Sequence, residues 1–315
     1  MTTLLLSHPA FTLHETPSGH PERVDRIRAV ERVLDQDRFQ PLLREEAPRA
    51  ARAALLNAHP EPHIAALEKA LPAEGFAAID SDTVMSPGTL EASLRGAGAA
   101  QRAVDAVLSG KAQNAFAAIR PPGHHAEHAT AMGFCFFNNA AIAARHAQKT
   151  FGIDRVAIID WDVHHGNGTQ DIFWNDASVM YCSTHEMPLY PGTGARDERG
   201  EHDTIVNAPL KAGDGGEIFR DAFTHLILPR LTQFSPELVI ISAGFDAHRE
   251  DDLAQMGLVE ADYAWITRRL MRVADEYAQG RIVSCLEGGY KLGALARSVA
   301  AHLRALSGTD GGAEA

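Results

Sequence analysis

The stretch RVAIIDWDVHHGNGTQ (residues 155–170) indicates the fold most clearly, because an apolar run leads directly into a cluster of acidic and histidine residues. Apolar runs without polar alternation are typical of strands in a parallel sheet that helices cover on both faces. Similar runs recur along the chain. Together with residues 155–160, the predicted strands are TLLLSH (3–8), NAFAAI (114–119), SVMYCS (178–183), ELVIISA (237–243) and RIVSCL (281–286).

Helical patterns lie between these runs. Apolar residues recur at spacings of three and four, as in amphipathic helices, within residues 93–108, 138–150, 216–231 and 261–280. This alternation predicts an α/β fold of three layers, with an open, mainly parallel sheet flanked by helices. We expect a single domain over residues 1–315 with a flexible tail at 307–315. The alanine-rich residues 47–58 are predicted to form helical surface.

The composition narrows the class of partner. Among 315 residues, 41 Asp and Glu outnumber 29 Lys and Arg, which gives a net charge of -12. Nucleic acid is therefore an unfavourable ligand, because contacts with phosphates need a basic surface. The first residues lack the cationic flank and long apolar core of a signal peptide, and no run reaches the length of a membrane span. With only Cys135, Cys182 and Cys285, widely spaced, we expect a cytoplasmic protein without a membrane partner.

Polar clusters follow the predicted strands. They are PPGHHAEH (121–128), DWDVHHGNGT (160–169), STHE (183–186), GFDAHRED (244–251) and EGGY (287–290). Because ligands bind at the carboxyl ends of the strands in an open parallel sheet, we expect these segments to converge on one crevice.

One of these clusters suggests a metal site. Asp160, Asp162 and His164 are spaced by two, so an extended backbone points them to one side. With Asp246 they offer oxygen and imidazole ligands suited to zinc or another divalent metal. Each residue taken alone would more often be a cap or a solvated side chain. Their combination predicts an ion with an open position for water.

Other residues suggest proton handling. His124 and His125 are adjacent after Pro-Pro-Gly, so two charged imidazoles would repel and their pKa values should be split by carboxylates, with Asp160 as the candidate partner of one. Tyr290 follows two glycines and could donate to a developing oxyanion. A His pair in a loop and a Tyr after a strand are also common without any function.

The chain resembles the zinc-dependent histone deacetylase family, which has the arginase and deacetylase fold. The resemblance is carried by ordered blocks over most of the chain, and Asn167 together with the HPER block is similar to class II members and bacterial deacetylase-like amidohydrolases. The blocks are HPERVDRI (20–27), PPGHHA (121–126), GFCFFNN (133–139), DWDVHHGNGTQ (160–170), YPGTG (190–194), GFDAHRED (244–251) and EGGY (287–290).

The resemblance implies specific roles. It makes Asp162, His164 and Asp246 ligands of one zinc ion. His125 becomes the general base and acid, and His124 its electrostatic neighbour, paired with Asp160. Tyr290 becomes the oxyanion donor. Water would attack an amide carbonyl to release acetate and a free amine. Asn167, in place of an Asp, leaves the protonation state of His125 open.

Further positions follow from the resemblance alone. The family's potassium site corresponds to Asp160, Ser183 and Thr184, with Asp162 and His164 contributing, several of them through backbone carbonyls. The tunnel for an acyl-lysine chain would be walled by Gly133, Phe134 and Tyr190, although Phe134 fits a core position equally well. Asp82 matches a rim residue that binds the substrate backbone, with Asp80 as a competitor. His165, His185 and Cys135 would be structural.

The substrate and the activity leave alternatives open. Acetylpolyamine amidohydrolases of the superfamily carry an acidic gatekeeper where this chain has Leu253, although Glu250, Asp251 and Asp252 blur the register. An acetyl-lysine protein, peptide or similar small amine is therefore favoured over an acetylpolyamine. A catalytically silent acyl-lysine reader and an arginase-like binuclear manganese hydrolase are the other hypotheses. The family also implies a homo-oligomer, and leaves the biological substrate, the acyl length and the metal in vivo unassigned.

Overall fold

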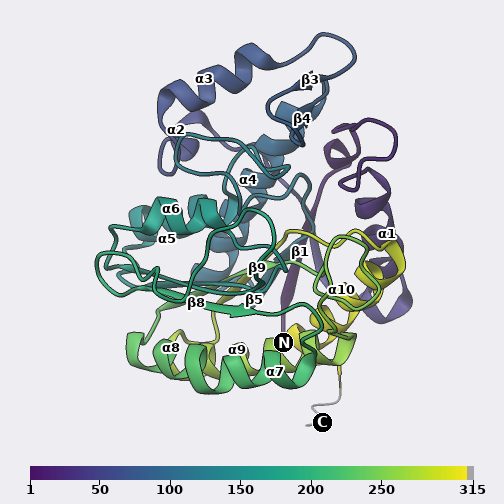
Figure 1. The fold of residues 1–315 in the computed structure, drawn as a ribbon. Coiled ribbons are helices and arrows are strands. Elements are labelled where there is room, and N and C mark those ends of the chain that lie inside the picture. The colour runs from purple at the N-terminus through teal and green to yellow at the C-terminus, as the bar shows by residue number, and fades with distance from the viewer. Residues whose placement is uncertain (311–315) are drawn as a thin grey trace.

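The computed structural model describes residues 1–310 and has a large parallel sheet between two layers of helices (Figure 1). Within these residues the sheet order is β2-β1-β5-β10-β9-β6-β7-β8, and neighbouring strands are parallel. The strands are β1 (Thr3–Ser7), β2 (Leu43–Glu46), β5 (Asn114–Ala117), β6 (Val156–Asp160), β7 (Val179–Glu186), β8 (Ile205–Leu210), β9 (Leu238–Ala243) and β10 (Ile282–Leu286). The predicted three-layer α/β fold is confirmed.

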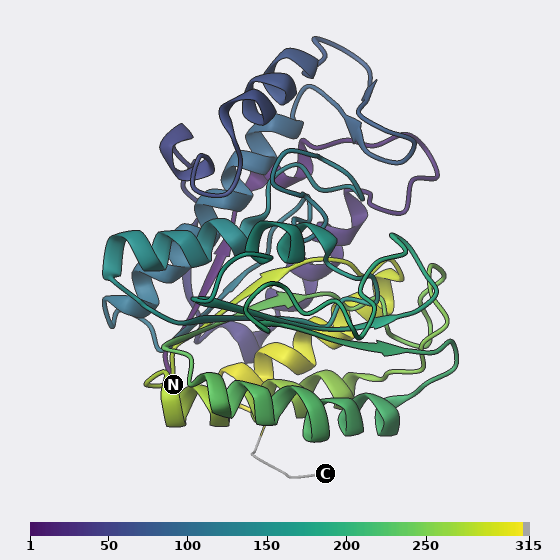
Figure 2. The same ribbon diagram turned by 60° about the vertical axis from the view of Figure 1, so that its left-hand side comes forward.

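Helices cover both faces of the sheet. α5 and α6 lie above it and α7, α8 and α9 below it in Figure 1, and Figure 2 shows the same layers after a turn. The α-helices are α1 (Asp25–Leu34), α2 (Arg52–Leu55), α3 (Glu61–Ala70), α4 (Thr89–Leu108), α5 (Asn139–Phe151), α6 (Asn167–Phe173), α7 (Gly216–Ala222), α8 (Leu228–Phe234), α9 (Glu260–Tyr277) and α10 (Leu292–Leu306). Short 3-10 turns η1 (Pro9–Thr12) and η2 (Asp37–Phe39) and a small antiparallel sheet of β3 (Ala77–Ala78) and β4 (Val84–Met85) complete the elements.

The central strands are buried on both faces, which explains their lack of polar alternation. All residues of β5, β6, β9 and β10 are buried. The edge strands β2 and β8 escaped prediction. β2 alternates between half-buried and exposed residues and reads LREE, and β8 contains Pro209, which is tolerated at a sheet edge and obscures a strand pattern.

Two helical predictions need correction. The segment 216–231 is not one α-helix, because a π-helical turn at Phe223–Ile227 separates α7 from α8. Within the alanine-rich segment 47–58 only Arg52–Leu55 are helical, and the segment is not simply surface. Ala47 and Ala58 are buried, and Ala50 donates its N–H to Leu94 O of α4 at 3.0 Å, so these small side chains allow close packing against that helix.

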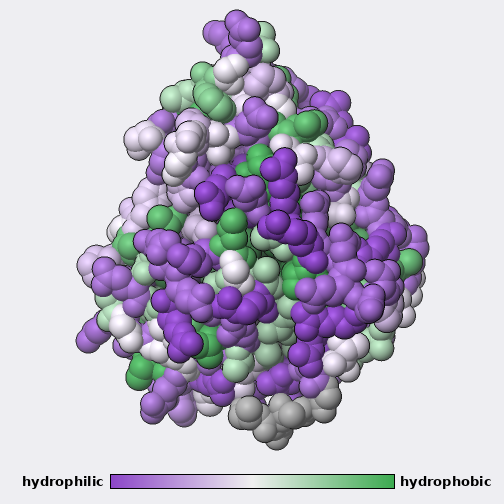
Figure 3. All heavy atoms as spheres, turned by 90° about the vertical axis from the view of Figure 1, so that its right-hand side faces the viewer, coloured by the Kyte–Doolittle hydropathy of each residue, from purple (hydrophilic) through white to green (hydrophobic). Residues whose placement is uncertain are grey.

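The face that Figure 3 shows is mainly polar. Hydrophilic residues cover most of the face in Figure 3, and hydrophobic residues lie between them in small groups. Among residues 1–310, no helix combines the length and the apolar character that crossing a membrane requires. Of the predicted flexible tail, Asp310 accepts a hydrogen bond from Arg268 at 2.6 Å, whereas residues 311–315 lie outside the described part of the chain.

His302 ties α10 to the core. Its Nε2 lies 2.9 Å from Ser284 Oγ and its Nδ1 lies 2.7 Å from Thr267 Oγ1. The Thr267 hydroxyl donates to Tyr263 O, so Nδ1 carries the imidazole proton and Nε2 accepts from Ser284. Burial lowers the pKa of His302 to about 3.

Acid is therefore expected to destabilise the fold through this residue. In the unfolded chain His302 regains a pKa near 6.5. As the pH falls below that value, the unfolded state binds the extra proton first, and stability is lost progressively until the folded pKa is reached. Replacing His302 with Gln should reduce the pH slope of the free energy of unfolding by about 1.4 kcal/mol per pH unit. Urea unfolding at several pH values between these limits measures this, and equal slopes would contradict it.

Candidate active site

Three buried side chains from neighbouring strand ends form one acidic pocket. Asp162 and His164 follow β6, and Asp246 follows β9, the strand paired with β6. Their ligand atoms all lie within 4.8 Å of one another. His164 Nδ1 is 3.1 Å from Asp162 Oδ1 and 3.2 Å from Asp246 Oδ2. The structure therefore brings together the residues that the sequence suggested as metal ligands.

The electrostatics of this cluster suit a divalent cation. Burial alone would lower the pKa of His164, but Asp162 and Asp246 raise it to about 10. The cluster of Asp162, His164 and Asp246 therefore favours positive charge. Gly288 packs against this cluster. Its N–H donates to Asp162 Oδ2 at 2.8 Å. A side chain there would not fit, because a Cβ would lie 2.1 Å from Asp246 Oδ2. Two carboxylates and one imidazole fit Zn²⁺, with room for a further ligand.

The first histidine of the pair is fixed by a carboxylate. His124 Nδ1 donates to Asp160 Oδ2 at 3.0 Å, and Tyr181 donates to the same oxygen at 3.0 Å. Burial opposes the charged form, but Asp160 and Asp162 raise the pKa of His124 to about 10. His124 is thus an imidazolium at neutral pH.

The second histidine has the opposite character. Burial and the neighbouring His124 and His164 hold the pKa of His125 well below its usual value, so its imidazole is neutral. His125 Nδ1 lies 2.8 Å from Asn167 Oδ1. The split between the two imidazoles agrees with the sequence-based expectation, and it leaves a neutral imidazole available to accept a proton.

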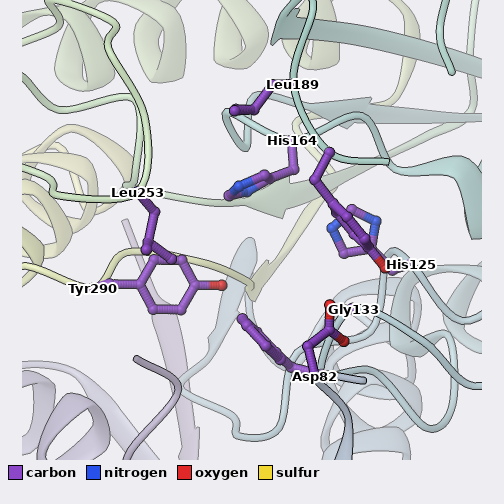
Figure 4. Close-up of a pocket in the computed structure, with 9 residues that line it drawn as sticks. Asp82, His125, Gly133, His164, Leu189, Leu253 and Tyr290 are labelled. Atoms are coloured by element: carbon purple, nitrogen blue, oxygen red, sulfur yellow. The ribbon is translucent and has the colours of Figure 1, made fainter. Parts of the chain in front are cut away.

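Of these groups, His125 and His164 line a cavity of about 210 Å³ (Figure 4). His125 and His164 lie on one side of it, and Tyr290 faces them with its hydroxyl directed into the cavity. The lining residues are Asp82, His125, Gly133, Phe134, His164, Leu189, Tyr190, Leu253 and Tyr290. Most of the wall is apolar or aromatic, as in sites that hold an alkyl chain.

The bend at Gly133 and Phe134 shapes the cavity. Gly133 has φ +57°, and a Cβ there would lie 2.4 Å from the His125 ring. Phe134 also has positive φ, which a phenylalanine rarely adopts. Its ring is half-buried and meets Tyr290 edge-on at 6.0 Å, so it forms wall rather than core. Cys135 is buried and its thiol donates to Gly133 O.

Tyr290 is held by Asp251, which the sequence analysis named only as an acid near the gatekeeper position, and by Arg26, which it did not single out. Asp251 Oδ2 accepts the Tyr290 N–H at 2.7 Å. The Arg26 guanidinium lies 4.9 Å from the Tyr290 ring centroid and donates from Nε to Gly289 O at 2.6 Å. Glu22, in the HPER block, pairs with Arg26 at 2.9 Å. Arg26 and Glu22 lie in a block that was quoted for its family resemblance alone.

A third missed residue is Glu287 of EGGY. Its Oε2 accepts the N–H groups of Gly123 and His124, and its Oε1 accepts from Ser242 Oγ at 3.0 Å. This buried carboxylate therefore fixes the backbone that carries the histidine pair. Leu189 and Tyr181 were also missed, because no local pattern distinguishes a loop Leu that lines a cavity or a Tyr inside a strand that donates to Asp160.

The structure distinguishes between Asp80 and Asp82, the two candidates for the rim residue. Asp82 lines the cavity, on the loop between β3 and β4. Asp80 instead accepts the N–H groups of Asp82 and Thr83 at 3.0 and 2.6 Å. Asp82 is thus the better placed of the two acids for the predicted rim position, which stays a prediction.

The remaining predicted residues lie behind the cavity. Asp160 and Ser183 are register partners on β6 and β7, and the buried Thr184 Oγ1 has no hydrogen-bond partner among the described residues. A potassium site there stays a prediction. His165 Nδ1 lies 2.8 Å from Thr193 Oγ1, and His185 Nε2 lies 2.9 Å from Gly194 O, so both histidines anchor the loop of Tyr190.

The fold and the site together define a known class of α/β protein. The crystal structure of the HDA15 HD domain superposes with a TM-score of 0.93 at 37% sequence identity, covering 98% of this chain and 88% of that chain. The family described as histone deacetylase domain matches residues 20–306. The chain therefore belongs to the histone deacetylase family, and the resemblance inferred from its motifs is confirmed.

Two relatives illustrate the similarity. A probable deacetylase of Archaeoglobus fulgidus is 39% identical over 321 residues, which span 98% of this chain and 88% of the relative. A histone deacetylase-like amidohydrolase of Pseudomonas aeruginosa is 39% identical over 279 residues, which span 87% of this chain and 73% of the relative.

Proposed function

We propose that this chain is a zinc-dependent deacetylase that hydrolyses the amide of acetyl-lysine or of a similar acylated amine. The observation that carries the proposal is the cluster of Asp162, His164 and Asp246, whose His164 lines one largely apolar cavity together with His125 and Tyr290. Family membership supports deacetylase activity in general. The unpaired Cys135, Cys182 and Cys285 are compatible with the cytoplasm.

Asp162, His164 and Asp246 would hold the zinc ion. A bound Zn²⁺ supplies a Lewis acid that polarises an amide carbonyl and activates water near neutral pH. His125, neutral and with Nδ1 engaged by Asn167, presents Nε2 to take a proton from the attacking water and pass it to the leaving amine. The charged His124 beside it favours the negative charge that develops on the carbonyl oxygen.

The other cavity residues would bind and orient the substrate. The Tyr290 hydroxyl donates to the developing oxyanion, and burial keeps its pKa well above the usual value, so the phenol retains its proton. Phe134 and Tyr190 offer flat faces to a methylene chain. Asp82 at the rim can accept N–H groups of a peptide backbone.

The side chains around Leu253 favour an acyl-lysine substrate over an acylpolyamine substrate. Leu253 itself lines the cavity. Glu250 pairs with Arg297 at 2.7 Å, Asp251 accepts backbone N–H groups, and Asp252 lies 3.4 Å from Lys291 Nζ. Leu253 thus lines the cavity, whereas Glu250, Asp251 and Asp252 are not among its lining residues.

Metal analysis beside a substrate panel tests the proposal. We expect about one zinc per chain and turnover of acetyl-lysine and trifluoroacetyl-lysine peptides in preference to acetylputrescine and acetylspermidine. Preference for the polyamines would identify the sister activity. Bound metal without any turnover would overturn the proposal in favour of an acyl-lysine-binding protein, and two manganese ions per chain would indicate the binuclear alternative.

Leu253→Glu should change the preference among these substrates. A carboxylate at this position would meet the distal ammonium of acetylspermidine, so kcat/KM for this substrate should rise by about tenfold relative to the acetyl-lysine peptide, which corresponds to about 1.4 kcal/mol. Leu253→Gln is the control, because Gln has nearly the same shape as Glu but no charge. If both variants shift the ratio equally, charge at this position does not select the substrate.

A further inference from the structure

The amide of Asn167 lies between two partners. Its Oδ1 lies 2.8 Å from His125 Nδ1, and its Nδ2 donates to Glu127 Oε1 at 2.8 Å. A carboxylate accepts hydrogen bonds and an amide has one donating and one accepting end. Glu127 therefore determines which end of Asn167 faces His125.

This orientation fixes the tautomer of His125. With Asn167 Oδ1 facing it, Nδ1 must carry the imidazole proton, which leaves the lone pair on Nε2. If the amide turned over, its N–H would face Nδ1 and favour the opposite tautomer, whose Nε2 cannot accept a proton. The other partner of Asn167 Nδ2, Met132 Sδ at 3.3 Å, is a weak acceptor and does not replace a carboxylate.

Glu127 is well placed for this task, because its own backbone is fixed. Its N–H donates to Thr130 O at 2.9 Å. Its carbonyl lies 3.1 Å from His59 Nδ1, and His59 Nε2 accepts the N–H of Asn138 at 2.9 Å, so Nδ1 is the donor. The side chain is half-buried at the start of the loop that follows the histidine pair.

We propose that Glu127 is a positioning residue that orients the Asn167 amide and so keeps His125 in the tautomer with a free Nε2. In this chain the pair of Glu127 and Asn167 takes the place of a single carboxylate beside His125. The inference rests on the proposed function, in which His125 Nε2 accepts a proton.

A double-mutant cycle between Glu127 and Asn167 tests it. Glu127→Ala should lower kcat roughly 10- to 100-fold with KM and metal content unchanged, the scale of lost outer partners in metal sites. In an Asn167→Asp background, Glu127→Ala should lower kcat by less than about threefold. Either oxygen of the Asp carboxylate can accept the hydrogen bond from His125 Nδ1–H, so no orienting partner is needed. Equal losses in the two backgrounds would overturn the proposal.

Two further variants separate orientation from loop stability. Glu127→Gln can present either end of its amide to Asn167, so its kcat should lie between those of the wild type and Glu127→Ala. Asp171→Ala removes the carboxylate that accepts the N–H of the next loop residue, His128, at 2.9 Å, whereas the Asn167 amide is bound by His125 and Glu127. It should leave kcat unchanged, and a loss matching that of Glu127→Ala would mean that loop anchoring, rather than orientation, is the cause.

A spectroscopic readout keeps this test independent of turnover. In metal-loaded protein with ¹⁵N-labelled histidine, with signals assigned by a His125→Gln variant, His125 should be protonated at Nδ1. Glu127→Ala should convert it to a mixture of tautomers. An unchanged tautomer would overturn the inference, whereas the expected change in a protein that hydrolyses no acyl amide would overturn the proposed function alone.

Discussion

Replacement of Asp246 with Ala should abolish metal retention and, with it, amide hydrolysis. Asp246 contributes one of two buried carboxylates beside His164, and its other oxygen accepts the Val163 N–H at 2.9 Å. Because a direct ligand is lost, the fall in zinc affinity should exceed the roughly 10- to 100-fold cost of an outer partner. Elemental analysis after gel filtration and turnover of an acetyl-lysine peptide measure the two effects.

Asp262→Asn provides the matched control for Asp246→Ala. Asp262 is also a buried carboxylate, but it caps α9 by accepting the Val259 N–H, pairs with Arg220 and does not line the cavity. The Asp262→Asn variant should retain zinc even if its free energy of unfolding is lower. Near-stoichiometric zinc in Asp246→Ala would refute the ligand assignment.

Tyr290→Phe should lower kcat by about 10² to 10³ while zinc content and KM stay close to those of the wild type. This is the scale observed when one oxyanion donor is removed. The ring would remain in place, since Arg26 and Phe134 contact the ring rather than the hydroxyl. Steady-state kinetics with an acetyl-lysine peptide provide the measurement.

Tyr263→Phe is the matching hydroxyl deletion. Tyr263 is fully buried, and its hydroxyl has no hydrogen-bond partner among residues 1–310. Its loss should leave kcat unchanged. If Tyr290→Phe is equally harmless, Tyr290 does not stabilise the transition state.

Much of this architecture could be predicted because burial on both faces produces a visible pattern. The runs around Val156–Ile159 and Leu238–Ala243 are apolar throughout, and the polar residues after them lie where parallel strands end. The edge strands β2 and β8 gave no such pattern, since one is half exposed and the other contains a proline. The π-helical turn at Phe223–Ile227 leaves the apolar spacing nearly unchanged, so periodicity cannot reveal it.

The candidate site could be predicted only as far as local motifs extend. Asp162 and His164 are two residues apart, and Asp246 and Tyr290 stand in polar clusters that follow other predicted strands. The supporting contacts are long-range: Glu287 lies 164 residues from Gly123, and Glu127 lies 40 residues from Asn167. Nothing in the spacing of these residues shows that their side chains meet, because that depends on how the whole sheet is assembled.

The placement of the donor atoms on two neighbouring strand ends also couples metal affinity to stability. His164 and Asp246 are 82 residues apart in the chain and meet only when β6 has paired with β9. The unfolded chain therefore lacks the site, and a cation that binds the folded form alone shifts the folding equilibrium by mass action. The melting temperature of this protein should consequently depend on the free metal concentration, and chelation should act as a denaturing condition.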